Sequence, residues 1–92
     1  MLSLNLLRIM GNYTKERLNQ VWDKGKPLKG KNPDLYRKDI YGNTMYKTSY
    51  GKNSEMGWSV DHSKPQAKGG TDHLNNLQPM NWKENIKKSD KY

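Results

Sequence analysis

Residues 57–91 set the strongest constraint on the fold, because short apolar pieces and turn-forming residues alternate there in a fixed order. Trp58 and Val60 alternate with polar residues, which predicts a short strand. A loop with paired glycines follows, and then come a second extended piece over residues 76–79 and a helix over residues 81–88. A strand, a loop, a strand and a helix in this order predict a small α+β unit.

Apolar residues are too few for a large core. Only 32% of the 92 residues are hydrophobic, and the chain has neither Phe nor Cys, whereas globular chains contain about 45–50% apolar residues. One small domain is therefore the most that this sequence predicts. Without cysteine the chain can form neither a disulfide nor a Cys-ligated structural zinc, and its composition fits any redox compartment.

The charge balance favours a polyanionic partner. Lys and Arg number 17 against nine Asp and Glu, which gives a net charge of +8. Nucleic acid is the first expectation and an acidic membrane surface the second, with a solvated basic surface as the alternative. Residues 24–38 combine Pro and Gly with many basic residues, so this stretch either lies on an anion or forms a solvated loop.

The first segment, residues 1–12, is apolar but short. Leu2, Leu6 and Ile9 fall at helical spacing, which predicts a helix that packs on the domain or faces a protein partner. The segment lacks the basic start and the cleavage site of a signal peptide. It is also far shorter than the ~20 apolar residues of a membrane span, so no membrane partner is expected through this segment.

Residues 13–56 are expected to support the unit that follows them. Thr14 can cap a helix whose apolar stripe includes Leu18 and Trp22. Residues 40–46 contain two short strand-forming pieces around a Gly-Asn pair, which predicts a β-hairpin. The tyrosines of this region either pack on sugar or base, or cover a thin core with their hydroxyl groups in water.

Polar residues in the constrained stretch suit the hydrolysis of a phosphodiester. That reaction needs a base to deprotonate water, and positive charge to neutralise the phosphoryl and leaving oxygens. His62 suits the base, because the unperturbed pKa of histidine is about 6.5. The carboxylate of Asp61 and the amide oxygen of Asn85 are hard ligands of the kind that bind Mg²⁺ or Mn²⁺.

The spacing of Asp61-His62, the paired glycines, Asn76 and Asn85 resembles the HNH endonuclease family in a D-H-N-N form. The lead-in to this motif is similar to that of small bacterial and phage members. The matching runs are Arg37-Lys38-Asp39, Tyr41-Gly42-Asn43, Tyr50-Gly51-Lys52 and Gly57-Trp58. The resemblance covers residues 22–91 and implies a cytoplasmic protein, encoded by a bacterium or a phage and acting in the host cell.

The resemblance also implies the architecture. The fold is expected to be α+β, with a ββα-metal finger over residues 57–92. An N-terminal helical segment over residues 1–12 and a supporting part over residues 13–56, with a short β-hairpin, complete the same domain. Many relatives fix the finger with a zinc bound by two cysteine pairs, which this chain lacks. Apolar residues are therefore expected to hold the finger: Trp58, Leu74, Leu77, Met80, Trp82 and Ile86.

Each residue of the motif receives a role from the resemblance. Asp61 and Asn85 match metal ligands, which favours one Mg²⁺ or Mn²⁺ ion and leaves Zn²⁺ or Ni²⁺ open. His62 matches the general base, and Asn76 matches the residue that orients the loop, and often the base, by hydrogen bonds to backbone. Adjacent strand residues point to opposite faces. His62 is therefore expected where its strand ends, or the base and the metal lie on opposite sides of the scissile group.

Lysines around the motif are candidates for phosphate contacts, with a solvated surface as the alternative for each: Lys64, Lys68, Lys83, Lys87 and Lys88. Such contacts position a duplex without reading its sequence. The pair Gly69-Gly70 either supplies backbone conformations with positive φ or lets the loop approach DNA closely. Thr71 or Asp72 is expected to cap a short helical turn, with Asp72 more a cap than a ligand, and His73 is expected to be a solvated loop residue.

The predicted function is metal-dependent hydrolysis of double-stranded DNA. The resemblance implies 5′-phosphate and 3′-hydroxyl ends. One base and one cation cut one strand at a time, so nicking and dimer-dependent double-strand cutting both stay open. The alternative is a non-catalytic basic module that binds DNA or RNA on the same fold.

Overall fold

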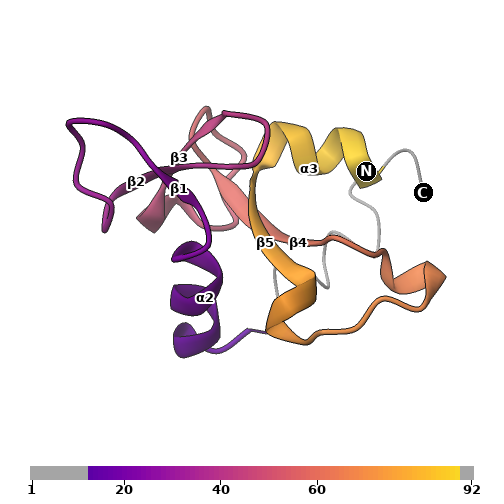
Figure 1. Cartoon of the computed structure of the whole chain (residues 1–92). Coiled ribbons are helices and arrows are strands. Elements are labelled where there is room, and N and C mark those ends of the chain that lie inside the picture. The colour runs from indigo at the N-terminus through magenta and orange to yellow at the C-terminus, as the bar shows by residue number, and fades with distance from the viewer. Residues whose placement is uncertain (1–12, 90–92) are drawn as a thin grey trace.

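In the computed structural model, residues 13–89 form an α+β arrangement with two small antiparallel sheets and two helices (Figure 1). Side chains are described as far as Lys87. The helix expected over residues 1–12 lies outside the described residues. The helices and strands are α2 (Lys15–Trp22), β1 (Lys26–Pro27), β2 (Tyr36–Lys38), β3 (Thr44–Tyr46), β4 (Trp58–His62), β5 (Leu77–Asn81) and α3 (Trp82–Ser89).

Helix α2 forms where the sequence supplies a cap and an apolar face. Thr14 is the N-cap, and its Oγ1 accepts a hydrogen bond from Arg17 N at 3.1 Å, which confirms the predicted cap. Val21 and Trp22 in the last turn are fully buried. The indole Nε1 of Trp22 donates to the carbonyl of Pro33 at 2.9 Å, so the buried ring keeps its donor paired.

The first sheet shows that the predicted hairpin was misplaced. Strands β2 and β3 pair antiparallel, and β1 joins the free edge of β2. Ile40 and Tyr41, which were predicted in a strand, lie in the turn between β2 and β3 and are 53% and 60% exposed. The reason is local, because Asp39 Oδ1 accepts hydrogen bonds from Tyr41 N and Asn43 N and so closes the turn.

The second sheet and α3 have the predicted order of strand, loop, strand and helix. Strands β4 and β5 pair antiparallel, with Trp58 opposite Asn81. Strand β4 continues to His62, and α3 begins at Trp82, directly after β5. Asn81 caps the helix, because its Oδ1 accepts a hydrogen bond from Lys83 N at 3.0 Å.

The core lies where α2 meets the β4–β5 sheet (Figure 1). The ring centroids of Trp22 and Trp58 are 5.1 Å apart, and Tyr50 packs against Trp58 at 5.0 Å. The ammonium of Lys24 donates to the backbone carbonyls of Leu74 and Leu77, which ties the end of α2 to the start of β5. Of the residues expected to hold the finger, Trp58, Leu77, Met80 and Trp82 are buried, and Leu74 and Ile86 pack against the core.

A buried carboxylate connects the two sheets. Asp39 is 1% exposed, and its Oδ2 accepts a hydrogen bond from Asn81 N at 3.0 Å. Its Oδ1 accepts from Tyr41 N at 3.0 Å and from Asn43 N at 2.9 Å. The amide of Asn81 donates in turn to the carbonyl of Thr44 in β3 at 3.0 Å. Polar bonds therefore support the junction of β5 and α3, in addition to the apolar contacts that the sequence predicted.

Candidate functional site

Ser59, Asp61 and Asn85 gather on one face of β4. Ser59 and Asp61 are two residues apart in the strand and so point the same way. From α3, Asn85 Nδ2 reaches Ser59 Oγ at 2.5 Å. Asp61 Oδ2 accepts a hydrogen bond at 2.7 Å from Gln78 Nε2, which lies opposite it in β5. Asp61 and Asn85 are 3% and 2% exposed, so both predicted metal ligands belong to one buried polar surface.

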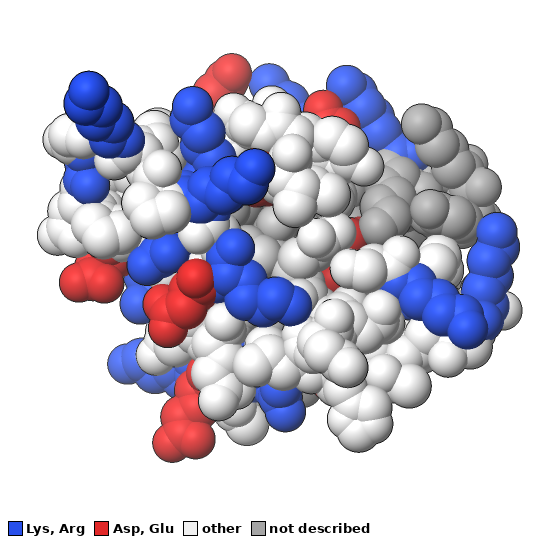
Figure 2. All heavy atoms as spheres, in the orientation of Figure 1, with Lys and Arg blue, Asp and Glu red and all other residues white. Residues whose placement is uncertain are grey.

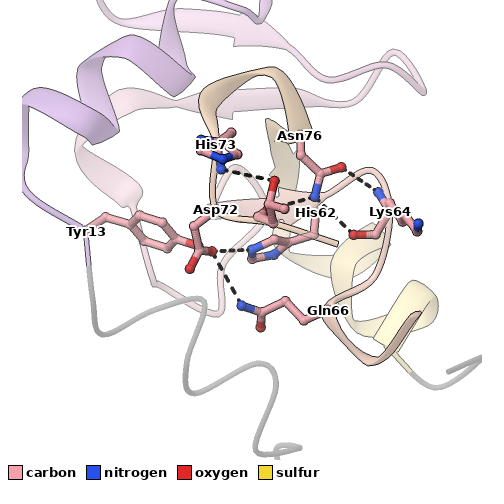
Figure 3. A network of polar contacts seen from close by, with 8 residues as sticks. Tyr13, His62, Lys64, Gln66, Asp72, His73 and Asn76 are labelled. Carbon is pink, nitrogen blue, oxygen red and sulfur yellow. Dashed lines mark hydrogen bonds and ion pairs between the residues drawn. The ribbon is translucent and has the colours of Figure 1, made fainter. Parts of the chain in front are cut away.

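His62 is the last residue of β4, which is one of the two arrangements expected for it. By strand alternation its side chain points to the opposite face from Asp61. Its ring Nε2 lies 2.6 Å from Oδ1 of Asp72, in the loop between β4 and β5 (Figure 3). The same oxygen is 3.4 Å from Gln66 Nε2 and 3.5 Å from the hydroxyl of Tyr13.

Asn76 closes the loop that carries Asp72. Its Oδ1 accepts a hydrogen bond from Lys64 N at 2.8 Å. Its Nδ2 donates to the carbonyl of Lys64 at 3.1 Å and to that of Thr71 at 2.8 Å (Figure 3). One amide side chain therefore joins the two limbs of the loop. The fixed position of Thr71 also fixes the backbone immediately before Asp72.

The paired glycines serve the internal geometry of this loop. Gly69 has a φ of 88°, a conformation that glycine adopts without steric cost. A Cβ on Gly70 would lie 1.8 Å from the carbonyl oxygen of Lys64. Positive φ, the first of the two predicted explanations, therefore accounts for Gly69. Gly70 is needed for a different reason, because the backbone of the same loop leaves no space for a Cβ at this position.

Tyrosines next to the core remain neutral over a wide pH range. Burial raises the pKa of Tyr13 well above its usual value, and the negative charge of Asp72 raises it further. Burial also raises the pKa of Tyr50 to about 12. Near neutral pH, Tyr13 is therefore a phenol that can donate its proton to the carboxylate of Asp72.

The predicted phosphate-binding lysines lie in two separate places. Lys64 and Lys68 are exposed in the loop that follows His62. Lys83 and Lys87 line a hollow of about 580 Å³ that α3 forms with residues 43–44 and 55–56, whereas Asn85 faces β4. They form exposed ion pairs at 3.4 Å with the carboxylates of Glu55 and Glu84, respectively. The side chain of Lys88 lies outside the described part of the chain.

Basic residues are spread over the surface rather than gathered at the site. In Figure 2, Lys and Arg are scattered among uncharged and acidic residues over the end formed by the β1–β3 sheet, and a smaller group lies at the opposite end. Lys24 and Arg37 donate hydrogen bonds to backbone carbonyls within the protein. Lys24 bonds to carbonyls of the β5 region, and Arg37 donates to the carbonyls of Asp23, Gly25 and Pro33. Lys26, Lys29, Lys31 and Lys38 are exposed.

Three residues of the site were missed or misassigned from the sequence. Asp72 was expected to cap a helical turn, but the 3₁₀ turn Leu74–Asn76 has His73 at its cap position and no side-chain cap bond. Asp72 faces His62 instead, while His73 is exposed as predicted. Ser59 could have been predicted as part of the site, because residues two positions apart in a strand lie on the same face and Ser59 precedes Asp61 by two. The position of Gln78 follows only from the register of β4 and β5.

The donor set on the Asp61 face fits a hard divalent cation. Asp61 offers a carboxylate, Asn85 an amide oxygen and Ser59 a hydroxyl oxygen, which are the ligand types that Mg²⁺ and Mn²⁺ prefer. A cation held there would have one carboxylate and two neutral oxygens from the protein. Within residues 13–89, no three His, Cys, Asp or Glu side chains come together in a metal-binding group.

No known protein family, curated protein or solved structure matches this chain. A functional assignment therefore depends on the residues themselves and on the geometry between them. Neither helix of the described region is long and apolar enough to cross a membrane.

Proposed function

We propose that this chain is a metal-dependent DNA endonuclease of the HNH type. The observation that supports the proposal is the position of the D-H-N-N residues within a single strand, loop, strand and helix unit. Asp61 lies on the same face of β4 as Ser59, to which Asn85 is hydrogen-bonded, and His62 is the last residue of the same strand. Asn76 closes the loop beside His62. The unit thus matches a ββα-metal finger in the order of its elements.

Each residue of the unit has a separable task in the proposed reaction. His62 takes the proton from the attacking water. Asp61 and Asn85 would hold one Mg²⁺ or Mn²⁺ ion, which would supply positive charge to stabilise the charge that develops during hydrolysis. Gln78 orients the carboxylate of Asp61 through the hydrogen bond at 2.7 Å. Asn76 keeps the loop in a fixed shape.

The charge of the chain supports duplex DNA as the substrate. A net charge of +8 favours binding to a polyanion whatever its sequence. Lys64 and Lys68 lie in the loop that also carries Asp72, so they are the lysines that we assign to phosphates next to the scissile one. Lys83 and Lys87 lie on the far side of α3 from Asn85 and are not assigned to these phosphates.

A second candidate is a basic DNA- or RNA-binding module without catalysis. The burial of the site favours it, because Asp61, His62 and Asn85 are 3%, 6% and 2% exposed and all form hydrogen bonds within the protein. Buried, paired polar groups of this kind can simply hold two strands and a helix together. Binding would then depend on the lysines and not on His62.

Cleavage of supercoiled plasmid separates the two candidates. The wild-type protein is expected to produce nicked or linear DNA with Mg²⁺ or Mn²⁺, and EDTA is expected to stop the reaction. His62→Ala should lower the cleavage rate by about 100-fold or more, because it removes the base, and should leave DNA binding unchanged.

His73→Ala is the matched control, since His73 is the chain's other histidine and is exposed. It should cut DNA at the wild-type rate. Equal cleavage by wild type and His62→Ala would contradict the nuclease proposal. Salt-sensitive DNA binding by the wild type without any cleavage in either metal would favour the binding module.

A further inference from the structure

Asp72 Oδ1 lies 2.6 Å from the ring Nε2 of His62 (Figure 3). From this geometry we propose that Asp72 is a positioning residue for the base. It fixes the His62 ring with the proton on Nε2 and so makes Nδ1 the nitrogen that takes the proton from water. The inference rests on the proposed nuclease function.

The assignment of the proton follows from the chemistry of the two groups. An ionised carboxylate has only acceptor positions, so the nitrogen that faces it must carry the hydrogen. A neutral imidazole has one protonated nitrogen and one lone pair. With the proton on Nε2, the lone pair of neutral His62 is on Nδ1. The carboxylate also stabilises the imidazolium that forms when the ring accepts a second proton.

Several contacts hold Asp72 in place for this task. Tyr13 and Gln66 approach the same oxygen that faces His62, at 3.5 and 3.4 Å. Asn76 holds the carbonyl of Thr71, the residue before Asp72, at 2.8 Å. A continuous path of contacts therefore leads from Asn76 through the loop backbone to Asp72 and on to the His62 ring. This path gives Asn76 a physical means of orienting the base.

Stability alone does not account for the pair. The side chain of Asp72 is 64% exposed, while that of His62 is 6% exposed. A carboxylate in water gains little by an ion pair or hydrogen bond at the surface, because solvent competes for the same positions. The contact fixes the orientation of the buried ring and contributes little to the stability of the exposed loop. A directional role for Asp72 follows from this asymmetry.

The tautomer of His62 tests the inference without any DNA. In protein labelled with ¹⁵N-histidine, the nitrogen and ring-proton shifts of neutral His62 should show the proton on Nε2. Asp72→Ala should remove this preference, and Asp72→Asn should weaken or reverse it, because an amide can present its NH₂ group to the ring. Asp34→Asn removes the same charge from an exposed position elsewhere and should leave the tautomer unchanged.

Cleavage by the same variants tests the role in the reaction. Both Asp72 variants should lower the turnover of DNA by about 100-fold or more, with unchanged DNA affinity and wild-type melting temperature. Asp34→Asn should cut normally. Unchanged turnover in Asp72→Asn, or a proton on Nδ1 in the wild type, would overturn the inference and leave the nuclease proposal intact. A wild type that cuts no DNA would refute the nuclease proposal, and the NMR result would still decide whether Asp72 fixes the ring.

Discussion

Replacing Asp39 by Ala should strongly destabilise this protein, although Asp39 lies outside the candidate site. The carboxylate is 1% exposed and accepts hydrogen bonds from the backbone N–H groups of Tyr41, Asn43 and Asn81. The last of these bonds joins residues that are 42 positions apart in the sequence. Alanine would leave all three donors without this partner. It would also separate the β2–β3 turn from the junction of β5 and α3.

The size of the effect follows from the exposure of the three donors. A hydrogen bond to a charged group contributes about 1.5–3 kcal/mol, and a buried donor left unpaired costs about 1–3 kcal/mol. Tyr41 is 60% exposed, so its N–H can turn to water, whereas Asn81 is 4% exposed. Removal of the carboxylate also removes the cost of burying a charge, which offsets part of the loss. We expect a loss of about 3–5 kcal/mol, against a total stability of roughly 5–15 kcal/mol.

Urea unfolding followed by tryptophan fluorescence measures this loss, because Trp22, Trp58 and Trp82 are all buried. Asp39→Asn keeps the shape of the side chain but replaces one of its two acceptor oxygens by an NH₂ group. It should lower the free energy of unfolding by about 2–3 kcal/mol. Asp34→Asn, at an exposed position, is the charge-matched control. If Asp39→Ala unfolds within about 1 kcal/mol of that control, the buried carboxylate does not connect the two sheets as described.

Three further predictions concern the loop and the core. Asn76→Ala removes the bonds to Lys64 and Thr71 and should speed proteolysis within residues 63–73, measured by the rate of limited digestion. Gly70→Ala places a Cβ 1.8 Å from a carbonyl oxygen and should destabilise the protein by about 2 kcal/mol or more in urea. Because burial raises the pKa of Tyr50 from 10.0 to about 12, the folded phenol stays neutral after the unfolded one ionises. The contribution of neutral Tyr50 to the free energy of unfolding should therefore be present in full below pH 10 and should fall as the pH rises towards 12. Tyr50→Phe should reduce that fall.

Local patterns in the sequence were sufficient for the helices and for the strands of the second sheet. Thr14 predicted the start of α2, and its cap bond is present. The alternation at Trp58 predicted β4, and the spacing of Trp82 and Ile86 predicted α3. These features depend on residues within a few positions of one another, so the local sequence is sufficient to predict them.

The position of the hairpin and the polar contacts could not be predicted from such local patterns. Ile40 and Tyr41 are strand-forming residues and suggested a strand, but the side chain of Asp39 closes a turn there. Its second oxygen accepts a hydrogen bond from Asn81 N. Whether an Asp closes a turn, caps a helix or faces a histidine depends on which distant segment packs against it. The same ambiguity explains why Asp72 was taken for a cap. Its partners Tyr13 and His62 lie 59 and 10 residues away.

The interior of this small protein contains several polar side chains within the described region. The buried polar residues within the described region are Asp39, Ser59, Asp61, His62, Asn81 and Asn85. Asp39 and Asn81 connect elements that are distant in the sequence. The other four lie along β4 and on α3, where apolar residues of similar size would usually stabilise the packing as well or better. In a chain with only 32% hydrophobic residues, these positions reduce an already small apolar area. A concentration of buried polar groups on one strand is what a site with fixed chemistry requires. The same groups would also be buried if they only joined β4 to its neighbours, and the cleavage assay with His62→Ala separates these two roles.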